Sequence, residues 1–338
     1  MEEKNTYIVY LRVIATIFVV LIHASTGFLY RIDTQAFDWK YANWINAATR
    51  CSVPIFVIIS GALLIPKEES TWTFYKKRIP KLLYPFIFWT IIYLIYYFYK
   101  FTKFELLSAE KIWSISQDKI LHGANAHLWY LYMIIGLYLA LPFLRKILIQ
   151  SSRGEIEIFL ALWLLSMFFM SKPLYAVTPK FDLTFFSGYI GYLVLGYYLS
   201  NYDFKFKNKK LIYPLIYILM VVIAAIGTQM LNTDVKKLNT FFYNYVFATT
   251  AIAAGALFVW IREISKQNKA PEWVLLIDKY SFGIYLAHII PLNFLHPLIS
   301  TFVGTAWVIP LATISTIIIS ILITFILRKL PFGKYVSG

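Results

Sequence analysis

The first apolar stretch of the chain reads Tyr7-Ile-Val-Tyr-Leu-Arg12-Val-Ile-Ala-Thr-Ile-Phe-Val-Val-Leu-Ile-His23. It is apolar apart from one arginine and one histidine, which lie eleven residues apart. Because eleven steps of about 100° make three turns plus roughly 20°, Arg12 and His23 are expected on one helix face, about 16 Å apart along the axis. Ionisable residues inside an apolar span are costly and usually functional. Snorkelling to lipid headgroups is the alternative for Arg12, whereas His23 lies too deep for it.

The composition is that of a membrane protein. Of 338 residues, 59% are hydrophobic and only 14% are charged, against about 25% charged residues in soluble domains. The net charge of +15 is explained better by the basic loops of a polytopic protein than by binding to nucleic acid. The single cysteine, Cys51, excludes an internal disulfide and a CxxC metal or redox site.

Apolar stretches of about 20 residues recur along the chain, and each is long enough to cross a bilayer as a helix. We therefore expect an all-α fold, a polytopic bundle of about ten transmembrane helices that forms one domain over residues 1–338. The expected spans are 7–28, 43–65, 82–100, 127–144, 156–172, 183–200, 211–231, 240–261, 277–299 and 307–327. The long connection 100–126 is a candidate lid or re-entrant segment.

The distribution of lysine and arginine predicts the orientation of the bundle. The segments on one side hold 19 of these residues, and the segments on the other side hold 10. The richer segments are 1–6, 66–81, 145–154, 201–210, 262–272 and 328–338. Because basic loops stay in the cytoplasm, both termini are expected to be cytoplasmic.

The second span carries Arg50, Pro54 and the pair Ser60-Gly61. Arg50 is expected at a depth similar to that of His23, where its charge would favour the neutral imidazole, the form that accepts a proton. A structural salt bridge to a loop carboxylate is the alternative for Arg50. Pro54 is expected to kink the helix, although ordinary helix packing is the simpler interpretation of both Pro54 and Gly61.

The densest basic cluster follows this span and contains Lys76, Lys77, Arg78 and Lys81. It lies on the same predicted side as Arg12, and Arg78 and Lys81 share a helix face because they are three residues apart. Two interpretations stay open. The cluster anchors the protein to anionic lipids, or it binds the phosphates of an anionic cytoplasmic cofactor.

Two further groups of residues are candidates for a site. His127 and Trp129 open the fourth span, where Trp129 is either an interfacial belt residue or a ring that stacks on a sugar. Ser281, Tyr285 and His288 share one face of the ninth span, because their spacings are four and three. For His288 a structural and a functional role are equally open.

Together these motifs resemble the acyltransferase-3 family of membrane O-acyltransferases, over nearly the whole chain, and in particular its stand-alone members that acetylate surface glycans. The motifs are Arg12-(ten residues)-His23, Arg50 with Val53-Pro54-Ile-Phe56 and Ser60-Gly61, Lys77-Arg78-x-x-Lys81, His127-x-Trp129-Tyr130, and Ser281-Phe-Gly-Ile-Tyr285-x-x-His288. One position departs from the family, which often has arginine where Lys81 stands.

The resemblance implies an enzyme of the bacterial cytoplasmic membrane. Acetyl-CoA would be the donor, a hydroxyl of an extracytoplasmic glycan or lipid-linked sugar would be the acceptor, and no metal would take part. The implied donor-binding residues are Arg12, Lys77, Arg78 and Lys81. The implied catalytic residues are His23, as general base or as carrier of the acyl group, Arg50 for the oxyanion, and His288 for proton transfer. The implied substrate-binding residues are His127, Trp129, Ser281 and Tyr285.

Two other functions stay open on the sequence. The chain could be an exporter of a polysaccharide or lipid-linked sugar, in which the same arginine and histidine residues line a pathway. A sensory membrane domain is a weaker third interpretation. The sequence leaves the oligomeric state open, a dimer included.

Overall fold

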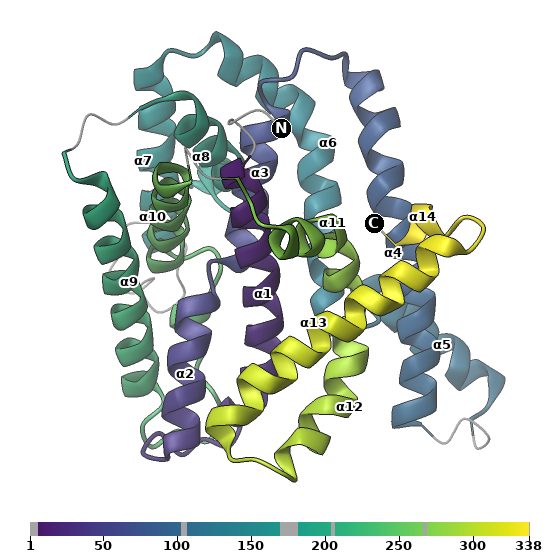
Figure 1. Ribbon diagram of the computed structural model, residues 1–338. Helices are drawn as coiled ribbons and strands as arrows, with labels where there is room; N and C mark the ends of the chain where they lie inside the picture. Colours follow the sequence, from purple (N-terminus) through teal and green to yellow (C-terminus); the bar gives the residue numbers. More distant parts are fainter. Residues whose placement is uncertain (1–5, 103–106, 170–181, 204–206, 266–268, 338) are drawn as a thin grey trace.

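The computed structural model describes residues 6–102, 107–169, 182–203, 207–265 and 269–337. Every regular element in these ranges is a helix, which confirms the predicted all-α class. The main helices are α1 (Thr6–Leu29), α2 (Phe37–Thr49), α3 (Ser52–Leu64), α4 (Thr71–Phe101), α5 (Ala109–His122), α6 (Trp129–Gln150), α7 (Arg153–Phe169), α8 (Ile190–Asn201), α9 (Lys209–Leu231), α10 (Ala248–Ile264), α11 (Glu272–Ala287), α12 (Ile289–Ser300), α13 (Thr305–Lys329) and α14 (Gly333–Val336). Figure 1 shows them as a bundle in which most helices run roughly parallel or antiparallel to α1, while α13 crosses obliquely.

Seven helices of the described ranges are long and apolar enough to cross a membrane. The pair α11 and α12 would be an eighth span, and it is bent by 82°, where the sequence predicts one continuous helix. The predicted spans 156–172 and 183–200 correspond to α7 and α8, which have 17 and 12 residues, and residues 170–181 lie outside the described ranges. The chain is thus a multi-pass membrane protein, while the count of about ten spans and the side of its termini stay predictions.

Helix α1 is the axis of the bundle. It packs against α2, α3, α10, α11, α12 and α13, and Figure 1 shows it in the middle of the view. Its apolar residues are buried on more than one side of the helix, Leu11, Ala15 and Val20 among them. A helix that is apolar all round is stable only where protein or lipid surrounds it, which explains why the first apolar stretch occupies the centre.

The second span is interrupted between α2 and α3, at Arg50 and Cys51. Pro54 accounts for this position, because proline has no N–H for the carbonyl four residues earlier, and its ring crowds that carbonyl. The helical pattern resumes with the bond from the Ile55 N–H to the Cys51 carbonyl, at 2.9 Å. The interruption places Arg50 at the junction of two helices.

The segment 100–126, expected as a lid or re-entrant loop, contains α5. This helix has no buried residue and lies at the edge of the bundle beside α4 (Figure 1). Trp113 and Leu121 are exposed on it and alternate with charged residues such as Lys111 and Asp118. Such a mixed surface explains why α5 stays outside the core.

Helices α3 and α8 approach each other so closely that only glycine fits at two positions. A Cβ atom on Gly61 would lie 2.0 Å from the backbone oxygen of Leu193, and one on Gly196 would lie 2.0 Å from that of Ile58. The sequence predicts close packing at Gly61, and the structure confirms it. This contact holds the α3 residues of the pocket described below against the rest of the core.

We predict that Gly196→Ala lowers the midpoint of thermal unfolding in detergent, because the two backbones must separate to admit the methyl group. Overpacking of this kind costs about 1–3 kcal/mol. Gly136→Ala is the matched control, since no atom lies within 4 Å of a Cβ at that helical position. Its midpoint should stay equal or rise, because alanine has the better helix propensity. Equal midpoints for Gly196→Ala and the wild type would contradict the close contact of α3 and α8.

Candidate active site

Three histidines from distant parts of the chain meet near the centre of the bundle. His23 lies on α1, His127 on a short 3-10 helix (Ala126–Leu128) that precedes α6, and His288 at the bend between α11 and α12. The ring centroids of His23 and His288 are 5.1 Å apart, those of His127 and His288 are 5.0 Å apart, and those of His23 and His127 are 6.4 Å apart. We call these three residues the histidine cluster. The sequence singles out each histidine but does not predict that His127 joins the other two.

The cluster contains nitrogen atoms that are free to accept a proton. Nδ1 of His288 lies 2.7 Å from the carbonyl oxygen of Tyr285, so it donates to that oxygen and leaves Nε2 unprotonated in the neutral ring. Nδ1 of His127 lies 3.0 Å from Oδ1 of Asn125 in the same way. In the described part of the chain, neither buried Nε2 receives a hydrogen bond. His127 and His288 are fully buried, whereas the His23 side chain is only partly buried.

Two tyrosines hold the backbone around the cluster. The Tyr285 hydroxyl donates to the carbonyl of His127, which ties α11 to the start of α6. The Tyr93 hydroxyl on α4 donates to the carbonyl of Leu286 at 2.8 Å, and its ring lies 4.8 Å from that of His127. The bend at His288 and the segment before α6 are therefore held together by hydrogen bonds.

Arg50 is linked to α1 near the histidine cluster through polar side chains. Its Nη2 donates to Oδ1 of Asn46 at 2.6 Å, and Nδ2 of Asn46 donates to Oγ of Ser25 at 2.5 Å. Ser25 lies two residues beyond His23 on α1. The guanidinium also lies 4.5 Å from the centre of the Tyr243 ring. Among the described residues no carboxylate forms an ion pair with Arg50, so the salt bridge considered from the sequence is not observed there.

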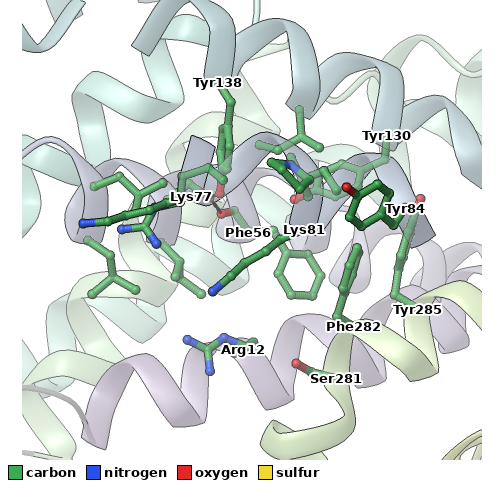
Figure 2. Close-up of a pocket in the computed structure, with 18 of the residues that line it drawn as sticks. Arg12, Phe56, Lys77, Lys81, Tyr84, Tyr130, Tyr138, Ser281, Phe282 and Tyr285 are labelled. Carbon is green, nitrogen blue, oxygen red and sulfur yellow. Dashed lines mark hydrogen bonds between the residues drawn. The ribbon is translucent and has the colours of Figure 1, made fainter. Parts of the chain in front are cut away.

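A pocket of about 880 Å³ lies between α1, α3, α4, α6, α11 and α14, a size typical of ligand sites, which span about 300–1,000 Å³. All four residues predicted to bind a cofactor line it, and so do Ser281 and Tyr285 (Figure 2). The complete lining is Arg12, Phe56, Ile59, Ser60, Leu63, Leu64, Lys76, Lys77, Arg78, Pro80, Lys81, Leu82, Tyr84, Tyr130, Ile134, Tyr138, Ser281, Phe282, Tyr285, Lys334 and Tyr335.

The pocket carries a positive charge. Six of its lining residues are lysine or arginine, and none of these described lining residues is acidic. Carboxylates behind the lining neutralise part of this charge: Arg12 pairs with Asp278 at 2.5 Å, and Glu69 lies 3.4 Å from Lys77 and 3.5 Å from Arg78. Asp278 is not among the residues predicted from the sequence, although an acid within an apolar span is itself a signal. Nor is Lys334, whose position depends on the packing of α14.

The two ends of the pocket differ in chemistry. Along α4 the pocket is lined by Lys77, then Lys81, then Tyr84. Along α6 it is lined by Tyr130 and Tyr138. Figure 2 shows Lys77 at one end, Arg12 and Lys81 in the middle, and the rings of Tyr130 and Tyr285 at the other end. Tyr285 also touches the histidine cluster, since its ring centroid lies 5.5 Å from that of His127. The pocket thus leads from a basic end to the histidine cluster, whose rings lie behind its aromatic end.

Trp129 lies outside this pocket, on the Arg50 side of the site. Its ring centroid is 5.5 Å from that of Tyr245 and 5.8 Å from that of Tyr189. All three rings are partly exposed, and Nη1 of Arg50 lies 3.5 Å from the Tyr245 hydroxyl oxygen. We call Trp129, Tyr189 and Tyr245 the aromatic platform. Only Trp129 is a candidate on the sequence, because the loops that bring the two tyrosines beside it are distant along the chain.

Comparison with known protein families identifies the chain. A model of acyltransferase family 3, described as an acyltransferase domain, matches residues 5–325. The chain belongs to the acyltransferase-3 family. The matched range includes the histidine cluster, Arg50 and every pocket residue except Lys334 and Tyr335. No curated protein and no solved structure shows significant similarity to the chain. Membership of the acyltransferase-3 family, together with the apolar helices, makes this protein a membrane acyltransferase.

We predict that Asn46→Leu destabilises the fold, because the partly buried Arg50 guanidinium then loses its amide acceptor. A lost hydrogen bond to a charged group costs about 1.5–3 kcal/mol, which should appear as a lower midpoint of thermal unfolding in detergent. Asn201→Leu is the control, since Asn201 is exposed at the end of α8. An Asn46→Leu midpoint equal to that of the control would show that the link between Arg50 and α1 contributes nothing to stability.

Proposed function

We propose that this acyltransferase moves an acetyl group from acetyl-CoA to a hydroxyl of a glycan or lipid-linked sugar across the bacterial cytoplasmic membrane. One observation carries the proposal: a single pocket is lined by six cations, has Lys77 and Arg78 at one end, and has at the other end Tyr285, whose ring contacts the histidine cluster. A donor with phosphates at one end and a thioester at the other matches this distribution. An exporter of a neutral sugar would have no use for so many cations in one pocket.

The donor would be held by charge at the basic end. Arg12, Lys77, Arg78 and Lys81 would bind the phosphates of CoA, where arginine can make two parallel hydrogen bonds to one phosphate. Asp278 and Glu69 pair with several of these cations, so the phosphates must compete with carboxylates for them. The long neutral arm of CoA would then extend along the apolar wall towards Tyr285. This arrangement requires the basic end to face the cytoplasm, as the lysine and arginine distribution predicts.

The acceptor would approach from the Arg50 side. The faces of sugar rings are apolar and pack on aromatic side chains, and the aromatic platform offers three partly exposed rings beside Arg50. This role extends the expectation for Trp129 to Tyr189 and Tyr245. His127 would connect the two substrates, because it lies two residues before Trp129 in the chain and its ring lies in the histidine cluster.

The reaction would transfer one acyl group from the sulfur of CoA to a hydroxyl oxygen of the acceptor. His23 would take the proton of the acceptor hydroxyl, whose oxygen attacks the thioester carbonyl. Arg50 would stabilise the negative oxygen of the tetrahedral intermediate, and the thiolate of CoA would leave and take up the proton that the imidazole holds. His288 would assist the movement of the proton through its free Nε2. In a two-step version, His23 itself carries the acyl group before the acceptor arrives.

We predict that Arg78→Ala raises the Kd for acetyl-CoA about tenfold, the effect of losing roughly 1.4 kcal/mol of phosphate binding, while kcat stays nearly unchanged. The Arg78 side chain is only 19% exposed, which strengthens its contact with an anion. Lys146→Ala is the control, because Lys146 is exposed at the same end of α6 but lies outside the pocket.

Asp278→Asn should change the affinity for acetyl-CoA in the opposite direction. It removes the carboxylate that pairs with Arg12, so acetyl-CoA should bind more tightly than to the wild type. The measurement for all three variants is calorimetric titration of the purified protein with acetyl-CoA. An unchanged Kd for Arg78→Ala would remove the phosphate-binding role from the basic end.

We predict that His23→Ala abolishes transfer, by at least about a hundredfold for the loss of a general base, while acetyl-CoA still binds. The assay is release of free CoA from acetyl-CoA by membranes that contain the native acceptor. His122→Ala is the control, because His122 is exposed on α5 and its ring forms hydrogen bonds to Asp118 on the same helix. Normal release by a folded His23→Ala variant would refute the assignment, and a wild type that moves the acceptor without consuming acetyl-CoA would favour the exporter.

A further inference from the structure

Four aromatic side chains form a continuous layer at the inner end of the pocket. They are Phe56 on α3, Tyr130 on α6, and Phe282 and Tyr285 on α11. Successive ring centroids are 6.2 Å apart from Phe56 to Tyr130, 5.3 Å from Tyr130 to Tyr285, and 6.3 Å from Tyr285 to Phe282. Figure 2 shows these rings gathered at the end opposite Lys77. We call them the aromatic layer.

Tyr285 joins the aromatic layer to the histidine cluster. All four residues of the layer line the pocket, whereas His23, His127 and His288 do not. Tyr285 is the part of the layer that contacts the cluster, since its ring centroid lies 5.5 Å from that of His127 and 6.2 Å from that of His288. An acyl group that reaches the histidines from the basic end must therefore lie against these rings.

Tyr285 is held more firmly than the other members of the layer. Its side chain is buried, and its hydroxyl donates to the carbonyl of His127. Displacing it would leave a buried hydroxyl without a partner, which is costly. Phe56, Tyr130 and Phe282 are only partly buried. The layer thus has one fixed residue and three that border the open volume.

We propose that the aromatic layer is a specificity device that restricts the acyl group of the donor to a short chain. The inference rests on the proposed function, in which cations hold the CoA phosphates. Because those contacts fix one end of the donor, the acyl group arrives at a fixed depth in the pocket. An acetyl group fits in front of the rings. A longer acyl chain has to displace close-packed aromatic side chains, or the whole donor has to shift so that its phosphates lose contact with the cations.

The depth order of the lining provides a matched control within the same pocket. Along α3 the lining runs from Phe56 in the layer to Leu63 near the basic end. Truncating Tyr130 or Phe282 enlarges the space in front of the acyl group. Truncating Leu63 removes similar apolar volume where the acyl group does not lie. Only the first kind of change should alter the preference for chain length.

The test is the binding of CoA, acetyl-CoA and hexanoyl-CoA to the purified full chain in detergent. The quantity compared is the ratio of the Kd for hexanoyl-CoA to the Kd for acetyl-CoA. We expect the wild type to bind hexanoyl-CoA about tenfold more weakly, and Phe282→Ala and Tyr130→Ala to lower the ratio about tenfold, a typical effect of reshaping an apolar pocket. Leu63→Ala should keep the wild-type ratio. Phe282→Leu, a milder truncation, should lower the ratio in the same direction if the alanine variants do not fold.

The outcomes separate this inference from the proposed function. A wild type that binds neither CoA nor acetyl-CoA would overturn the proposed function. A wild type that binds both, with one ratio shared by the wild type, Phe282→Ala, Phe282→Leu and Leu63→Ala, would overturn the size restriction and leave the donor site intact. A ratio that falls equally in Leu63→Ala and Phe282→Ala would also overturn it, because pocket volume in general would then set the preference.

Discussion

A charged or titratable side chain inside a membrane-spanning bundle needs a partner or a cavity, because neither lipid nor packed apolar core solvates it. This constraint explains the arrangement around α1. Arg12 pairs with Asp278 on α11 and faces the pocket, and Arg50 finds Asn46 and the ring of Tyr243. Each cation is solvated by the protein. The Arg12 pair joins α1 to α11, whereas the bond of Arg50 to Asn46 stays at the end of α2.

Two contacts between α1 and α11 show the relative direction of these helices. On α1 the chain runs from Arg12 to His23, and on α11 it runs from Asp278 to His288. Arg12 meets Asp278 at one end, and His23 meets His288 at the other, so α1 and α11 run in the same direction. A ligand that competes with Asp278 for Arg12 would therefore act on the helix that ends in His288. The bend of 82° that follows His288 then carries α12 away from α11.

The pocket and the aromatic platform reach the histidine cluster from different helices. The pocket has cations and then rings along its length. The platform lies beside Arg50, at the first residue of α6 and in the segments that precede α8 and α10. Two substrates of different chemistry could thus meet without sharing a binding surface. In the proposed function, the rings at the aromatic end of the pocket would limit the access of water, which would protect a reactive thioester from hydrolysis.

The sequence by itself determined what local periodicity and composition control. Those are the helical class, the membrane setting, the placement of Arg12 and His23 on one helix, and the resemblance to the acyltransferase-3 family, which the match over residues 5–325 confirmed. Only the tertiary structure decided that His127 joins His23 and His288, that Asp278 pairs with Arg12, and that Tyr189 and Tyr245 flank Trp129. The physical reason is that these neighbours come from helices far apart in the chain. Their meeting depends on close packing between such helices. Ser60-Gly61 predicts a close contact, but it does not predict that Leu193 on α8 is the partner.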